Sequence, residues 1–201
     1  MFDARLRGWI DPPLNTAGRL LARVNVGADE VTLTGFVCGM MGAVAIVFNQ
    51  MLVALALILI GRLLDGLDGA IARATRSTDR GGFLDIALDF VFYGSVPLAF
   101  AMLDPYRDAL PAAALIASFY ANGAVFLAYG IMAEKRGLES KLQGEKSLFY
   151  MAGLAEGAET IVVFVAFCLF PSLFPWVAGA FAAVCYASAG ARLILAWRTL
   201  T

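Results

Sequence analysis

The sequence predicts an all-α membrane protein, a bundle of six transmembrane helices preceded by an N-terminal interfacial amphipathic segment. Three observations predict this fold class: 61% of the 201 residues are hydrophobic, the mean hydropathy is +0.78, and the charged residues gather between long apolar stretches. Soluble domains are only about 45–50% apolar, which argues against a water-soluble fold. The net charge of -1 gives no reason to expect a nucleic-acid partner.

The segment before the first apolar window alternates apolar residues with arginines and is interrupted by Pro12-Pro13. Such a stretch can lie in the lipid headgroup layer, where anionic lipids attract its arginines. A solvated N-terminal arm is the alternative. Residues 1–23 carry six charges and no apolar centre, so we do not interpret them as a secretory signal.

Six apolar windows are long enough, or nearly so, to cross a hydrocarbon layer that requires roughly 20 helical residues. They cover residues 31–48, 51–72, 82–103, 109–133, 147–170 and 173–197. Short links join them, and no internal repeat divides them. We therefore expect one six-helix domain over residues 31–201, with residues 1–30 as a cytoplasmic interfacial segment.

The basic residues predict the orientation, because cytoplasmic loops of membrane proteins are enriched in Lys and Arg. Arg62 and Arg192 fall inside windows and are left out. Arg107 alone would lie on one side of the membrane, and twelve residues would lie on the other: Arg5, Arg7, Arg19, Arg23, Arg73, Arg76, Arg80, Lys135, Arg136, Lys141, Lys146 and Arg198. We expect a multi-pass protein of the inner (cytoplasmic) membrane with both termini in the cytoplasm.

Cysteine and histidine usage limits the available chemistry. Cys38, Cys168 and Cys185 stand singly inside apolar runs, without the spacing of a zinc site or a disulfide framework, and we expect them to pack in the core. The chain contains no histidine. A general acid or base, and any ligand of a hard metal ion, must therefore come mainly from Asp or Glu.

Four aspartates, Asp65, Asp68, Asp85 and Asp89, lie within 25 residues at the facing ends of the second and third windows. A charged group at the centre of a membrane helix costs at least about 2.5–3.5 kcal/mol, so their presence calls for a function. Residues three or four apart share one helix face, and both pairs lie a similar number of residues from the connecting loop. The four carboxylates can therefore converge.

Converging carboxylates would repel one another and become protonated unless a cation neutralised them. Ligation by oxygen alone suits hard ions such as Mg²⁺, Mn²⁺ or Ca²⁺ rather than zinc. Two such ions can bridge a diphosphate and stabilise both the attacking and the leaving oxygen. The aspartates therefore predict phosphoryl-transfer chemistry with Mg²⁺ or Mn²⁺, and two ions are expected.

Small residues flank the aspartates: Gly69, Ala72, Gly81 and Gly82. Without side-chain bulk, a base or a phosphate can approach the backbone there. Close helix packing is the alternative interpretation. The nearby arginines, Arg73, Arg76 and Arg80, can pair with phosphates, although for the last two an anchoring role at the cytoplasmic face is an equally good interpretation.

These residues resemble the signature of the CDP-alcohol phosphatidyltransferases, Asp-x-x-Asp-Gly-x-x-Ala-Arg, about eight residues, then Gly-x-x-x-Asp-x-x-x-Asp. The matching positions are Asp65, Asp68, Gly69, Ala72, Arg73, Gly81, Asp85 and Asp89. Only seven residues separate Arg73 from Gly81, so either Gly81 or Gly82 can take the place of the family's glycine.

The resemblance implies a homodimeric enzyme whose site opens to the cytoplasmic leaflet. It would transfer a phosphatidyl group from a CDP-linked lipid such as CDP-diacylglycerol to an alcohol and release CMP. Asp65, Asp68 and Asp85 would hold the metal ions. Asp89 would approach a metal and act as the general base, and Arg73 would steady the diphosphate.

A second, shorter similarity lies at the first window. Family members often begin this span with Pro-Asn-x-Leu/Ile-Thr-x-x-Gly/Arg, and residues 28–35 resemble that pattern at Thr32 and Gly35, with Ala28-Asp29 in place of Pro-Asn. The resemblance implies that Thr32 or Asp29 contacts the cytidine. Capping of the first transmembrane helix is an equally good role for Asp29.

The acceptor alcohol is left open. Glu156, Glu159, Arg192 and Arg62 are charged residues inside predicted spans. They can line an acceptor pocket or form ion pairs that fix helix packing. A phosphorylated acceptor would favour nearby cations such as Arg136, Lys141 and Lys146, whereas glutamates better suit hydroxyls or an amine.

A cation transporter or channel is the rival interpretation, because ion pathways also use acidic residues inside the membrane. It predicts carboxylates spread through the bilayer and, in many transporters, an inverted repeat. Here four carboxylates cluster near one face and no repeat is found. The enzyme interpretation is therefore preferred.

Overall fold

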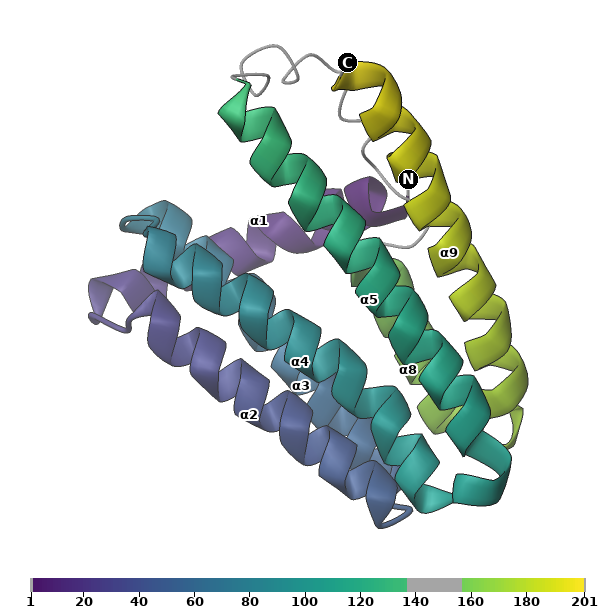
Figure 1. Cartoon of the computed structure of the whole chain (residues 1–201). Coiled ribbons are helices and arrows are strands. Elements are labelled where there is room, and N and C mark those ends of the chain that lie inside the picture. Colours follow the sequence, from purple (N-terminus) through teal and green to yellow (C-terminus); the bar gives the residue numbers. More distant parts are fainter. Residues whose placement is uncertain (1, 137–156, 201) are drawn as a thin grey trace.

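The computed structural model describes residues 2–136 and 157–200, and its regular structure there is helical throughout (Figure 1). The elements are α1 (Phe2–Arg23), α2 (Ala28–Val47), α3 (Met51–Ala74), α4 (Asp79–Leu103), α5 (Pro105–Lys135), α8 (Gly157–Leu169), the 3-10 turn η1 (Pro171–Leu173) and α9 (Phe174–Thr199).

Five of the six predicted windows agree with α2, α3, α4, α5 and α9, whose ends lie within four residues of the expected ones. The remaining window, residues 147–170, is matched by α8 from Gly157 onward, and its earlier residues lie outside the described part of the chain. Local signals fix several ends. Thr78 caps α4 by accepting from the backbone N–H of Gly81, and Asp104 caps α5 with Pro105 at the first helical position.

The N-terminal segment differs from the expectation. A break was predicted at Pro12-Pro13, but α1 continues through both prolines. Proline fixes φ at a helical value, but inside a helix it removes a backbone hydrogen bond and its ring crowds the carbonyl four residues earlier. Packing of α1 on α3 compensates, because Gly18 is buried so closely that a Cβ on it would lie 2.7 Å from the Cβ of Ala70.

Four described segments are long and apolar enough to cross a membrane: α2, α4, α5 and residues 171–199. Helix α3 has 24 residues, but from its middle onward it carries Arg62, Asp65, Asp68 and Arg73. The described part of α8 has 13 residues. The fold is thus all-helical with several candidate spans, and the total of six spans and the placement of the termini stay predictions.

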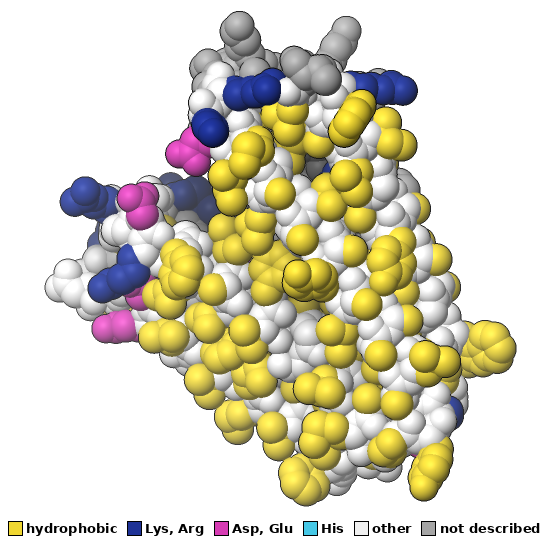
Figure 2. All heavy atoms as spheres, in the orientation of Figure 1, with side chains coloured by type: hydrophobic (Ala, Val, Ile, Leu, Met, Phe, Trp, Pro, Cys, Tyr) yellow, Lys and Arg dark blue, Asp and Glu magenta, His cyan; other side chains and the backbone are white. Residues whose placement is uncertain are grey.

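The surface agrees with a lipid environment. Figure 2 shows apolar side chains covering most of the visible face over the lengths of the helices, while the charged side chains gather mainly where α2 and α4 begin and where α5 and α9 end. Many large apolar side chains are strongly exposed, among them Leu52, Leu110, Trp176 and Trp197. A soluble monomer rarely exposes such a continuous apolar area.

The core is an aromatic cluster between α4, α8 and the start of α9. It contains Phe92, Phe100, Phe164, Phe167 and Phe174, each at most 1% exposed. The rings of Phe100 and Phe174 are stacked at 4.4 Å. All three cysteines are free; Cys168 and Cys185 are buried in this core, as expected, and Cys38 is half-buried.

Helices α2, α3 and α4 form the layer that carries the site, and α5 joins them to α9 (Figure 1). Three buried glycines of α2, Gly35, Gly39 and Gly42, allow close approach. A Cβ on Gly61 of α3 would lie 2.8 Å from the carbonyl oxygen of Gly35, and one on Gly39 would lie 2.8 Å from the Phe92 ring. These contacts, which we call the glycine seam, fix α2 against α3 and α4.

Candidate metal and nucleotide site

The site forms where α3 ends and α4 begins. The four-residue turn after Ala74 reverses the chain, so the last turns of α3 face the first turns of α4. Carboxylate oxygens of Asp65, Asp68 and Asp85 lie within 4.8 Å of one another. We call these three residues the aspartate cluster. Helical spacing predicted that side chains from both helices would meet, and these three do.

Asp68 makes the cluster suited to a cation. Its residue is only 6% exposed, and its Oδ2 has no hydrogen-bond partner among the described residues. A buried carboxylate oxygen without a partner is costly unless a positive charge neutralises it. Asp85 is exposed and leaves the cluster open on one side. The all-oxygen donor set fits a hard divalent ion.

Asp89, the fourth predicted carboxylate, is placed differently. Its Oδ1 accepts a hydrogen bond from Nη1 of Arg62 at 2.7 Å, and its Oδ2 accepts one from the Tyr93 hydroxyl at 3.3 Å. Nη2 of Arg62 also lies 3.4 Å from Oδ1 of Asp65. Asp89 is therefore held by an ion pair beside the aspartate cluster, and its role as a metal ligand stays a prediction.

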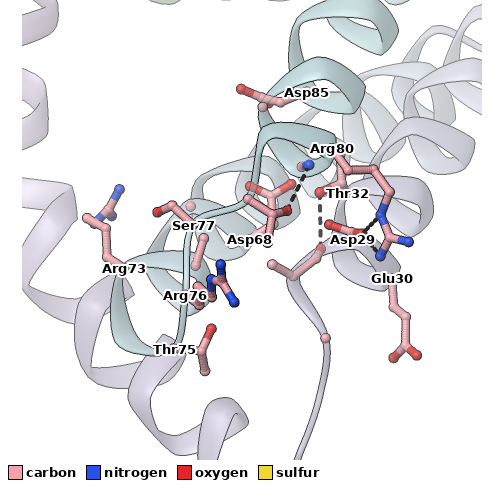
Figure 3. A pocket seen from close by; sticks show the side chains of 17 residues that line it. Asp29, Glu30, Thr32, Asp68, Arg73, Thr75, Arg76, Ser77, Arg80 and Asp85 are labelled. Carbon is pink, nitrogen blue, oxygen red and sulfur yellow. Dashed lines mark hydrogen bonds and ion pairs between the residues drawn. The ribbon is translucent and has the colours of Figure 1, made fainter.

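A cavity of about 500 Å³ opens beside the cluster (Figure 3). Its walls come from the start of α2, the end of α3, the following turn and the start of α4. Eight residues singled out from the sequence line it: Thr32, Asp68, Gly69, Ala72, Arg73, Gly81, Gly82 and Asp85. Asp29, Arg76 and Arg80 also line it.

The small residues of the cavity are not in close helix contact. A Cβ on Gly82 would meet no described atom within 4 Å, and one on Gly69 would meet only the end of the Arg73 side chain, at 3.2 Å. At Gly81 a Cβ would lie 3.2 Å from Asp29 Oδ1 and from Thr78 Oγ1. The close-packing alternative therefore describes the glycine seam and not Gly69 or Gly82.

Two arginines of the cavity are held by other elements. Nη2 of Arg73 donates to Oδ1 of Asn15 on α1 at 3.0 Å. Nε of Arg80 donates to Oδ2 of Asp29 at 2.8 Å, which joins the start of α4 to the start of α2 (Figure 3). Helix capping, the alternative role for Asp29, is wrong: Gly27 is the N-cap of α2, without a side-chain cap.

Comparison with known proteins identifies the family. The sequence pattern of the CDP-alcohol phosphatidyltransferases matches residues 26–189. The chain belongs to this family. The resemblance found in the aspartate motif is thereby confirmed.

Relatives and solved structures agree with this CDP-alcohol phosphatidyltransferase assignment. The inner membrane protein YnjF of Escherichia coli (strain K12) is 41% identical over 200 residues, covering 100% of this chain and 97% of that protein. An archaetidylinositol phosphate synthase of Pyrococcus horikoshii is 27% identical over 165 residues, covering 81% of this chain and 80% of the relative. The apolar helices and the similarity to an inner membrane protein together indicate a multi-pass membrane protein.

The fold is also that of a solved enzyme. Crystal structures of the phosphatidylinositol phosphate synthase PgsA1 of Mycobacterium tuberculosis superpose with TM-scores of 0.65 and 0.66 at 21% identity. Each match covers 92% of this chain, and they cover 93% and 88% of the other chain. One of these structures has CDP-DAG bound, and the other is a complex with manganese and citrate.

Several contacts of this phosphatidyltransferase were not anticipated from the sequence. These are the pairs Asp89–Arg62, Asn15–Arg73 and Asp29–Arg80, and the lining residues Glu30, Thr75, Ser77 and Thr78. Arg62 carried a detectable signal, since a lone arginine three residues before Asp65 in an apolar run requires a buried partner. Of the two roles considered for Arg62, lining an acceptor pocket or forming ion pairs, the structure shows ion pairs with Asp89 and Asp65.

The predicted acceptor residues are only partly described. Glu156, Lys141 and Lys146 lie outside the described residues. Glu159 is half-buried on α8 and is not among the residues that line the cavity, and its Oε2 has no hydrogen-bond partner in the described part of the chain. Nη1 of Arg192 donates to Asn122 at 3.0 Å, and its guanidinium lies 5.2 Å from the centre of the Phe126 ring.

Proposed function

We propose that this protein transfers a phosphatidyl-type group from a CDP-linked lipid, such as CDP-diacylglycerol, to an alcohol and releases CMP, as an enzyme of phospholipid biosynthesis. The observation that carries the proposal is the aspartate cluster, with oxygens within 4.8 Å, beside a cavity lined by the motif residues Gly69, Ala72, Arg73 and Gly81. Family membership supports the reaction class. The CDP-DAG complex of the mycobacterial enzyme supports the class of lipid donor.

Asp65, Asp68 and Asp85 would hold divalent metal, Mg²⁺ or Mn²⁺, with two ions expected. When bound, the metal supplies positive charge that stabilises the diphosphate and the departing CMP. The partnerless Oδ2 of Asp68 supports this use of the cluster. The manganese complex of the mycobacterial enzyme is consistent with it.

The cavity walls would bind the nucleotide end of the donor. Thr32 and the open backbone at Gly69 and Gly82 leave room for the cytidine and the diphosphate. Arg73 would pair with a phosphate, since guanidinium groups bind phosphate oxygens through paired hydrogen bonds. Its hydrogen bond to Asn15 at 3.0 Å limits where its guanidinium can point.

Asp89 would act as the general base. Its carboxylate would take the proton of the acceptor hydroxyl while that oxygen attacks the phosphorus on the lipid side, and the bond from this phosphorus to the CMP oxygen breaks. Hydrogen bonds from Arg62 at 2.7 Å and from the Tyr93 hydroxyl at 3.3 Å hold this carboxylate in place.

We propose a phosphorylated polyol as the first candidate for the acceptor alcohol. Two archaeal relatives are named archaetidylinositol phosphate synthases, and the mycobacterial structures are of a phosphatidylinositol phosphate synthase. Glycerol phosphate, inositol and serine are the other candidates. A phosphorylated acceptor would draw on the basic residues Arg136, Lys141 and Lys146, and Glu156 or Glu159 would contact hydroxyls.

We further infer six membrane spans over residues 31–201, an interfacial segment over residues 1–30, a site facing the cytoplasm and a homodimer. Charged side chains gather mainly where α2 and α4 begin and where α5 and α9 end, which supports a cytoplasmic orientation of this end of the helices (Figure 2). The name of the Escherichia coli relative supports an inner-membrane location.

The experiment is a CMP-release assay with purified protein, CDP-diacylglycerol and a panel of alcohols, run with Mg²⁺, with Mn²⁺ and with EDTA. We expect release that needs both one acceptor and a divalent ion, because four aspartates near the phosphates repel the substrate without metal. Well-folded protein that releases no CMP with any acceptor contradicts the proposal. Cation flux through liposomes would then favour a transporter.

A further inference from the structure

Helix α1 is fixed against the site helix α3 by close packing. A Cβ on Gly18 would lie 2.7 Å from the Cβ of Ala70, and a Cβ on Gly66 would lie 2.9 Å from Cδ1 of Leu14. The contacting residues are four apart on each helix, so one face of α1 meets one face of α3. Figure 1 shows α1 running across the bundle rather than along it. Apolar packing therefore holds α1 in place without the help of a polar contact.

Asn15 lies beside this packed face and reaches the last turn of α3. It is half-buried, and its Oδ1 accepts a hydrogen bond from Nη2 of Arg73 at 3.0 Å. Asn15 lies one turn before Gly18 on α1, and Arg73 lies one turn after Ala70 on α3. Because the packed faces fix the two backbones, the Asn15 amide has a fixed position from which it holds the guanidinium.

The Arg73 side chain folds back along α3 toward the cavity. Its Nη1 would lie 3.2 Å from a Cβ on Gly69, one turn earlier, and both residues line the cavity. Figure 3 shows Arg73 and Arg80 on opposite sides of Asp68. A guanidinium carries five N–H donors, and the bond to Asn15 uses one of them. The same guanidinium can therefore be held by Asn15 and still pair with a phosphate.

We propose that Asn15 is a positioning residue, whose amide oxygen holds the Arg73 guanidinium in the orientation that pairs with the diphosphate of the CDP-linked lipid. This inference rests on the proposed function. It extends the donor site to α1, whose residues precede the range 26–189 that the family pattern matches. An arginine that is already oriented loses less rotamer freedom when the donor binds, so the donor binds more tightly.

The alternative is that the hydrogen bond between Asn15 and Arg73 only docks α1 on α3. A docking bond would lower the melting temperature when it is removed, and the folded protein would bind the donor as before. A positioning bond would weaken donor binding in protein that is fully folded, because Leu14 and Gly18 still hold α1 in place. Stability and donor affinity therefore separate the two roles.

The test uses full-length protein in detergent and the variant Asn15→Ala. The KM for CDP-diacylglycerol and kcat are measured by CMP release, and the Kd for CDP is measured by calorimetry with Mg²⁺. We expect KM and Kd to rise roughly three- to tenfold, the effect of having to order one flexible side chain on binding. The value of kcat should change little, because the arginine pairs with the diphosphate before and during the reaction. The melting temperature should stay close to that of the wild type.

Thr16→Ala is the matched control on the same helix. Thr16 is exposed, and its hydroxyl donates to the Pro12 carbonyl of α1 itself at 3.0 Å. Its removal should change neither KM nor Kd.

A double-mutant cycle asks whether Asn15 acts through Arg73. Arg73→Met keeps much of the length of the side chain but has no N–H donor. In this background Asn15→Ala should raise the Kd for CDP no further, because the guanidinium that Asn15 orients is gone. Equal increases with and without Arg73 would show that Asn15 acts independently of it and would overturn the proposal.

Asn15→Asp provides a second test that does not depend on the folding of Asn15→Ala. It keeps an oxygen acceptor for Arg73, so the melting temperature should not fall. Its charge competes with the diphosphate for the guanidinium, so the Kd for CDP should rise by roughly tenfold. Thr16→Asp adds the same charge at the next, exposed position and should raise the Kd less. An unchanged Kd in Asn15→Asp, or equal increases in the two variants, overturns the role.

The outcomes separate this inference from the proposed function. Wild-type values of KM and Kd in folded Asn15→Ala overturn the positioning role, whatever the melting temperature. If wild-type protein binds CDP but releases no CMP with any acceptor, the proposed reaction fails, and the Kd values still test Asn15. If wild-type protein binds no CDP, both proposals fail.

Discussion

The two halves of α3 use the same residue type for opposite purposes. In the first half, Gly61 meets the α2 backbone so closely that a Cβ would lie 2.8 Å from a carbonyl oxygen. In the second half, a Cβ on Gly69 would approach only a flexible arginine, beside an open cavity. Glycine at the seam brings helices together, whereas glycine at the cavity keeps space free.

The difference shows how a membrane enzyme can separate stability from chemistry within one helix. The seam has apolar neighbours such as Ile58 and Phe92, each fully buried. The cavity half carries Asp65 and Asp68, whose burial is unfavourable without a cation. We therefore expect cavity substitutions to impair turnover or donor binding without loss of stability, and seam substitutions to reduce stability first.

The largest effect among the site residues is expected from Asp89→Asn, beside the aspartate cluster. The amide keeps the size of the side chain but cannot accept the proton, so CMP release should fall on the order of a thousandfold. Mn²⁺ binding should remain measurable, because Asp65, Asp68 and Asp85 are unchanged. Steady-state CMP release beside Mn²⁺ titration checks both. Normal turnover in this variant would refute the role of Asp89 as base.

The next largest effect on CMP release is expected from Asp68→Asn. The substitution removes one ligand oxygen from the cluster, and CMP release should fall by on the order of 10²–10³-fold, the usual effect of losing a group that stabilises a transition state. Thermal stability without metal should not fall, because Oδ2 of Asp68 has no hydrogen-bond partner to lose among the described residues. Thermal melts with and without Mn²⁺ measure this. A large loss of metal-free stability would show that Asp68 is a structural residue.

Gly61→Ala tests the seam. The added Cβ would meet the backbone at Gly35 and Gly39, which cannot rotate away as a side chain can. Overpacking of this kind costs typically about 1–3 kcal/mol, so the melting temperature should fall, and activity should fall only as the folded fraction does. Gly130→Ala is the matched control, because a Cβ there would meet no described atom within 4 Å. Equal melting temperatures for the two variants would contradict the seam.

The sequence was sufficient for much of the fold because long apolar runs leave the chain few alternatives in a membrane. Helix α3 was predicted at 51–72 and observed at Met51–Ala74. The aspartate pairs were predictable because spacings of three and four place side chains on one face. The aspartate motif indicated the family because its eight positions combine residue type with fixed spacing.

Other features depend on contacts that spacing does not encode. Nothing in the sequence places Asp29 beside Arg80, or Asn15 beside Arg73, because these pairs join helices distant in the chain. Arg62 has two possible carboxylate partners on neighbouring turns and helices, and only the packing of Phe92 and Tyr93 fixes its position. The seam glycines and the cavity glycines also look alike in a sequence, since neighbouring helices determine what each one meets.

Gly82→Ala is the smallest and most discriminating change. Gly82 lies in the first turn of α4, and a Cβ there would meet no described atom, so stability should rise by up to about 1 kcal/mol through the better helix propensity of alanine. The methyl group would nevertheless project at the cavity wall, so KM for the CDP-lipid should increase a few-fold with kcat nearly unchanged. Thermal melts and CMP-release kinetics measure the two effects separately. An unchanged KM would show that the donor does not approach Gly82, and the position of the family's motif glycine would then belong to Gly81.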